Sequence, residues 1–104
     1  MKHDIPHDLE FDLAKLAAEK AADAYKQRFA EYDYKHSWVT DKRVELSFRV
    51  AGKTLKGAMN VKEGKLELEL DVPFVFRPFR GKAIEIIEKE ARTWIDKAKK
   101  GELS

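Results

Sequence analysis

The sequence predicts an α+β domain with the element order β-α-β-β-β-β-α, built on a curved antiparallel sheet that a long C-terminal helix covers. Three observations predict this fold class. Apolar residues recur at helical spacing near both ends of the chain, apolar and polar residues alternate through its middle, and short turns separate the alternating segments. A chain of 104 residues suits one domain, which we expect to span residues 1–104.

The first expected elements are a short strand and a helix. Residues 2–6 are expected to form an edge strand that stops at Pro6, because proline has no N–H to donate. An alanine-rich helix is expected from Asp8 to Glu31, with Asp8 as its N-cap. Its apolar residues occupy two arcs instead of one, which indicates contacts on two sides. Because that surface exceeds what a single sheet covers, a homodimer is one expected assembly.

The middle of the chain alternates with a period of two, as a strand does when only one of its faces is buried. The apolar positions are Tyr34, His36 and Trp38, then Val44, Leu46, Phe48 and Val50, then Leu55, Gly57, Met59 and Val61, and then Leu66, Leu68, Leu70 and Val72. Turn residues at 40–42, 51–53 and 63–64 separate these segments. The pattern predicts antiparallel strands with one apolar and one polar sheet face.

A last helix is expected from Pro78 to Lys99, because proline suits a first helical turn and Gly101 suits a C-terminal stop. The apolar residues of this segment form one stripe, so the helix is the expected cover of the apolar sheet face. The whole would be a reduced form of the helix-grip arrangement, in which a long terminal helix lies across a curved sheet.

Composition excludes several classes of function. Charged residues make up 38% of the chain, but the net charge is only +2 and the lysines are interspersed with acids, so nucleic-acid binding is not expected. The absence of cysteine excludes disulfides and thiolate chemistry. The chain has no apolar run of the ~20 residues that a spanning helix needs, and its start lacks the pattern of a signal peptide. We therefore expect a cytoplasmic protein without a membrane span.

A metal site is the first chemistry to weigh. His3, Asp4, His7 and Asp8 place metal-ligating groups close together near the start of the chain. However, Pro6 interrupts this segment, which keeps the two histidines off a common helical face. A structural role for His7, bonded to a nearby backbone group at the helix entry, is favoured, and no metal is expected.

Catalysis is disfavoured on similar grounds. His36 has no nucleophile with a recognisable motif nearby, and a general base needs such a partner within hydrogen-bond reach. The acids Glu67, Glu69 and Asp71 alternate with leucine, which indicates the solvated face of a strand. The chain has no nucleophile-elbow, phosphate-loop or zinc-helix motif. We expect neither an enzyme nor a cofactor.

The segment from Pro73 to Phe79 is the least ordinary stretch, with three phenylalanines between two prolines and after the last strand. One interpretation is that these rings plug the gap between sheet and helix. The other is that they form an exposed apolar patch for a partner, a lipid or a polymer surface. The candidate binding residues of this patch are Phe74, Phe76 and Phe79, with Phe11 and Phe29 as further members.

Several motifs carry a family resemblance over nearly the whole chain. They are Ile5-Pro6-His7-x-Leu9, an alanine-rich helix with Ala14, then Trp38, Asp41, Phe48, Gly52, Gly57 and Val61, and finally Val72-Pro73. The chain resembles the putative polyhydroxyalkanoic acid system proteins. This resemblance implies a bacterial cytoplasmic protein linked to polyhydroxyalkanoate synthesis, use or granule surfaces. It implies no catalytic residues, and it implies structural roles for His7, Trp38 and Gly57.

These observations favour a non-catalytic binding or regulatory module of polyhydroxyalkanoate storage. Its partner would be the polymer granule surface or a granule-associated protein, contacted through the aromatic patch. The alternative is a carrier of a small hydrophobic ligand, with a pocket between the sheet and the last helix. That pocket would be lined by Phe48, Met59, Leu68, Ile87 and Trp94.

Overall fold

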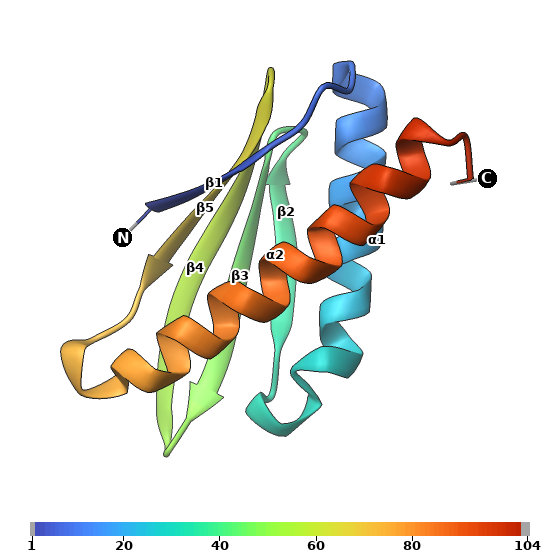
Figure 1. Cartoon of the computed structure of the whole chain (residues 1–104). Coiled ribbons are helices and arrows are strands. Elements are labelled where there is room, and N and C mark those ends of the chain that lie inside the picture. The colour runs from blue at the N-terminus through green and yellow to red at the C-terminus, as the bar shows by residue number, and fades with distance from the viewer. Residues whose placement is uncertain (1, 103–104) are drawn as a thin grey trace.

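The computed structural model describes residues 2–102 and shows a five-stranded antiparallel sheet with two helices on one of its faces (Figure 1). The strands are β1 (Lys2–Pro6), β2 (Lys35–Thr40), β3 (Arg43–Val50), β4 (Lys53–Lys62) and β5 (Lys65–Asp71). Their order across the sheet is β1-β5-β4-β3-β2, so β2 to β5 follow one another as hairpins and β1 pairs with β5. The predicted α+β class and element order are confirmed.

The helices are α1 (Phe11–Arg28) and α2 (Arg77–Lys99), and the short 3-10 turns η1 (Ala30–Tyr32) and η2 (Phe74–Phe76) precede β2 and α2. The predicted start of the first helix is wrong. Glu10 occupies the N-cap and makes no side-chain capping bond. Asp8 lies before the helix, and its carboxylate is 3.1 Å from the Lys99 ammonium. The hydrogen bond from Lys99 lowers the pKa of Asp8.

Both helices cover the sheet: α2 does so as predicted, and α1 lies beside it on the same face. Helix α1 crosses α2 on the same side of the sheet (Figure 1). Its inward residues are mostly alanines, which allow close packing against both neighbours. The buried Tyr25 hydroxyl donates a hydrogen bond of 2.8 Å to the Ile87 carbonyl of α2. The two apolar arcs of α1 are thus covered within one chain. The homodimer stays a prediction, but the apolar surface of α1 no longer argues for it.

The core lies between the covered sheet face and the helices. Its centre holds an aromatic cluster in which the Phe29 ring lies 4.8 Å from the Phe48 ring and 6.0 Å from the Tyr34 ring. The Tyr34 hydroxyl donates to the Ala22 carbonyl, which satisfies its polar end. Burial raises the pKa of the Tyr25 phenol well above its usual value, so this group stays a neutral donor.

Two backbone positions explain residues of the family motif. A Cβ on Gly57 would stand 2.7 Å from the Glu69 carbonyl oxygen and 2.8 Å from Leu70 Cδ2, so only glycine fits where β4 and β5 approach. Ala51 and Gly52 both have positive φ, of 52° and 79°, in the two-residue loop between β3 and β4. That combination is typical of a type I′ hairpin turn, in which glycine is favoured.

Candidate functional site

The chain presents an apolar tip where β5 ends and α2 begins. We define the apolar tip as Pro73, Phe74 and Val75, of which Phe74 is 80% exposed and Val75 is 75% exposed. The segment forms the 3-10 turn η2, in which the Phe76 N–H donates a 2.9 Å hydrogen bond to the Pro73 carbonyl. Large apolar side chains that a folded chain leaves in water are informative, because burying them elsewhere would have been favourable.

The residues after the tip anchor it to the body of the protein. Phe79 is partly buried, and its ring lies 4.9 Å from Tyr32 and 5.6 Å from Phe48 at the edge of the aromatic cluster. Beside the tip, the Arg77 guanidinium lies over the Phe74 ring at 5.4 Å. Each interpretation of this segment therefore holds for one of its residues. Phe79 closes the gap between sheet and helix, and Phe74 projects into water.

Of the other predicted patch residues, Phe76 is half-buried in η2, and Phe11 and Phe29 lie elsewhere. Phe11, 40% exposed, begins α1 and lies near Lys42 in the turn between β2 and β3. That turn is at the opposite end of the sheet from the apolar tip (Figure 1). Phe29 is only 1% exposed, inside the aromatic cluster. Its prediction as a surface residue is wrong, because the turn after α1 directs its ring beneath the helices.

The residues of the alternative pocket belong to the core. Phe48, Met59, Leu68 and Ile87 are each at most 1% exposed and form one packed cluster with the alanines of α1. Trp94 packs against this cluster, and its indole N–H donates to the Glu90 carboxylate at 3.2 Å. The structure therefore gives no support to a ligand pocket between sheet and α2. Its hollows lie on other surfaces.

The histidines are engaged in structural contacts. The Nδ1 of His7 accepts the Leu9 N–H at 3.1 Å, and its Nε2 is 3.0 Å from the Lys62 carbonyl. This arrangement suits the neutral ring with its proton on Nε2. His3 contacts Glu88 of α2. Among residues 2–102, no group of three or more potential metal ligands comes together.

His36 lies on β2 beneath α1, with its Nε2 at 3.5 Å from the Asp23 carboxylate and its Nδ1 buried without a hydrogen-bond partner in the described part of the chain. Burial lowers the pKa of His36, although Asp23 acts in the opposite direction. A neutral imidazole packed against the Tyr34 ring is therefore the stable form at neutral pH.

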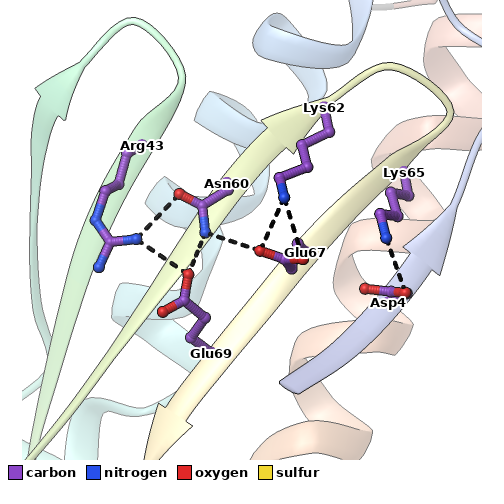
Figure 2. A network of polar contacts seen from close by, with 7 residues as sticks. All are labelled: Asp4, Arg43, Asn60, Lys62, Lys65, Glu67 and Glu69. Atoms are coloured by element: carbon purple, nitrogen blue, oxygen red, sulfur yellow. Dashed lines mark hydrogen bonds and ion pairs between the residues drawn. The ribbon is translucent and has the colours of Figure 1, made fainter. Parts of the chain in front are cut away.

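The sheet face opposite the helices, here called the open face, carries a polar network (Figure 2). The Arg43 guanidinium donates to the Asn60 side-chain oxygen and to Glu69, both at 3.1 Å. The Lys62 ammonium donates to Glu67 at 3.2 Å. The pKa of Glu69 is lowered, chiefly by the hydrogen bond from Asn60, so it remains a carboxylate. The predicted solvated face is thus cross-linked, and Glu67 is only 8% exposed.

Beside this network the open face is hollowed. The hollow has a volume of about 850 Å³ and is lined by residues of all five strands. Ala58, 2% exposed, lies at its floor among longer charged neighbours. Sequence reasoning missed this feature, because it arises from the register of strands that are distant along the chain. The available signal was one small apolar residue, Ala58, on the otherwise polar face of its strand.

These features define a small two-layer α+β module with an exposed apolar tip and a hollowed polar sheet face. In the described part of the chain, no helix is both long and apolar enough to cross a membrane. The family model described as "Putative polyhydroxyalkanoic acid system protein" matches residues 2–95. The chain therefore belongs to that family, as its motifs predicted. A search of curated proteins found no match.

Proposed function

We propose that this protein is a non-catalytic module that attaches to the surface of polyhydroxyalkanoate granules in the cytoplasm through its apolar tip. The observation that carries the proposal is the exposure of Phe74 and Val75, at 80% and 75%, on an otherwise well-packed domain. Membership of a polyhydroxyalkanoic acid system family supports the choice of surface, because such granules present an apolar polyester to the cell.

The energetics fit reversible attachment. Burying an exposed Phe or Val side chain contributes about 1.5–3 kcal/mol, so inserting both tip residues stabilises the bound state by on the order of 3 kcal/mol. This corresponds to a partition factor on the order of 100. Arg77 is exposed and its guanidinium lies over the Phe74 ring, so a long cationic side chain, of the kind that keeps its charge in water at an apolar interface, stands beside the inserted ring. The domain would thus exchange between granule and solution.

The non-catalytic part of the proposal is supported by the histidines. Both nitrogens of His7 face backbone groups, and the His36 ring lies under α1. Neither ring faces the apolar tip or a nucleophile. The structural use of His7 agrees with the role that the family motif implies for it.

Sedimentation with granules tests the proposal. The double variant Phe74→Ser/Val75→Ser should lose most of the bound fraction, by on the order of 100-fold in partition coefficient. The matched control is Val39→Ser, which removes an apolar side chain that is 50% exposed on the edge strand β2. Circular dichroism should show that both variants keep the wild-type fold.

Two preparations identify the partner. Protein-free polyester particles should bind the wild-type chain as native granules do. Binding to native granules alone would reassign the partner to a granule-associated protein. Equal binding by the tip variant and the Val39 control would contradict the proposal on either surface.

A further inference from the structure

The hollow on the open face contains a row of cations with a hydroxyl between them. Strand register places Lys35 of β2 opposite Ser47 of β3, and Ser47 opposite Lys56 of β4. Neighbouring strands lie about 5 Å apart, so the two lysine backbones are about 10 Å apart with Ser47 midway. Their flexible side chains can both reach an anion above the Ser47 hydroxyl. We call Lys35, Ser47 and Lys56 the cation row.

The charges around the cation row leave it open to a ligand. Arg43 is committed to Glu69 at 3.1 Å and lies 3.9 Å from Glu45, so these nearby carboxylates are already paired. Within residues 2–102, neither Lys35 nor Lys56 takes part in an ion pair. The hollow therefore has Arg43 between the carboxylates of Glu45 and Glu69, and two lysines outside these ion pairs. The remaining acid of the lining, Asp71, lies opposite Lys56 in the strand register.

The floor of the hollow favours a ligand with an apolar part. Its lining includes the small or apolar residues Leu46, Gly57 and Ala58 among longer charged ones. A volume of about 850 Å³ lies in the range of small-molecule sites, which combine an apolar lining with a few polar groups that orient the ligand. The site suits a small amphiphilic anion more than a bare inorganic one.

We propose that this hollow binds the carboxylate of a free hydroxyalkanoic acid. The carboxylate lies between Lys35 and Lys56 and accepts a hydrogen bond from the Ser47 hydroxyl. The alkyl chain covers Ala58, and the hydroxyl of the ligand faces Ser37, which lies in the next row of the sheet. The anion site rests on the geometry of the open face. The choice of a hydroxy acid rests on the family's link to polyhydroxyalkanoate, as does the proposed function. The protein would then sense the acids from which the polymer is made.

A titration of the ¹⁵N-labelled protein with sodium 3-hydroxyoctanoate, followed by NMR, tests this site. Chemical shifts should move for the backbone amides of Lys35, Ser47, Lys56 and Ala58, and they should saturate together. The double variant Lys35→Gln/Lys56→Gln should bind about tenfold more weakly. The control Lys20→Gln/Lys89→Gln removes the same charge from exposed positions on α1 and α2 and should bind as wild type does.

Other outcomes overturn the proposal. If the uncharged methyl ester binds as tightly as the acid, or if the lysine double variant keeps wild-type affinity, the cation row is not the site. If inorganic phosphate or octanoate binds as tightly, the site is a general anion site and the assignment to hydroxy acids is wrong. The variant Phe74→Ser/Val75→Ser should bind the acid normally, so failure of granule attachment and failure of this site are distinguishable.

Discussion

Two phenylalanines show how differently this chain treats the same side chain. Phe29 follows α1 and is 1% exposed in the aromatic cluster, whereas Phe74 follows β5 and is 80% exposed at the apolar tip. Phe29 continues the buried face of a helix, so packing draws its ring inward. Phe74 lies in a connection with proline on both sides, where no periodic element directs a ring toward the core. The contrast indicates that aromatic residues here serve two purposes, stability under the helices and contact at the tip.

The largest expected difference between these regions is in stability. Replacing Phe29 with Ala should lower the free energy of unfolding by about 3–5 kcal/mol, because it removes a buried ring that contacts four other aromatic side chains. Replacing Phe74 with Ala should change it by less than about 0.5 kcal/mol. Urea unfolding measures both. A large loss of unfolding free energy in the Phe74 variant would mean that the tip is part of the core.

Glycine provides a second test of the contrast between packed and open positions. Gly57→Ala should cost about 1–3 kcal/mol, because its Cβ would stand 2.7 Å from a backbone oxygen. Gly81→Ala, in α2 with nothing within 4 Å of the new Cβ, should stabilise the protein by about 1 kcal/mol. Thermal unfolding of the two variants should therefore shift in opposite directions. A Gly57→Ala variant that is as stable as the wild type, or more stable, would contradict the close approach of β4 and β5.

The covered face should also respond to acid. The pKa of His36 is lowered by burial, so as the pH falls below about 6.5 the unfolded chain takes up a proton before the folded one does. Stability should decrease there, by at most about 1.4 kcal/mol per pH unit from this group. The variant His36→Gln should lose that part of the slope between pH 7 and pH 5 in urea titrations. An unchanged slope would show that His36 is not the responsible group.

The open face should give the smallest effect. Arg43→Ala removes the centre of the polar network, but the pairs are partly exposed and each contributes about 0.2–1 kcal/mol. We expect a loss of about 1 kcal/mol or less in urea, smaller still in high salt. A loss comparable with that of Phe29→Ala would mean that this network, and not the aromatic cluster, dominates the fold.

The fold could be predicted from the sequence because alternation and helical spacing show directly which residues of a segment share one face. The segments that end in Val50, Lys62 and Asp71 are strands as expected, and the last helix starts one residue before its predicted start. The prediction of Asp8 as the N-cap was wrong, because its carboxylate pairs with Lys99, which is distant along the chain. Local propensity contains no information about such a partner.

The candidate sites could be predicted less completely from the sequence, because they too depend on contacts between residues that are distant along the chain. The sequence identified the segment Pro73–Phe79, but only the packing of Phe79 against Tyr32 and Phe48 separates its anchor from its exposed tip. The hollow on the open face could not be predicted, because Lys35 and Lys56 become neighbours only through the register of three strands.

The most direct test of the central claim asks which part of the molecule touches the polymer. The chain has no cysteine, so Val75→Cys introduces a unique thiol for an environment-sensitive dye such as acrylodan, and Val39→Cys provides the matched label on β2. On addition of protein-free polyester particles, the emission of the dye at position 75 should shift to the blue and that at position 39 should stay unchanged. A blue shift at position 39 alone, or no shift at either position, would contradict attachment through the apolar tip.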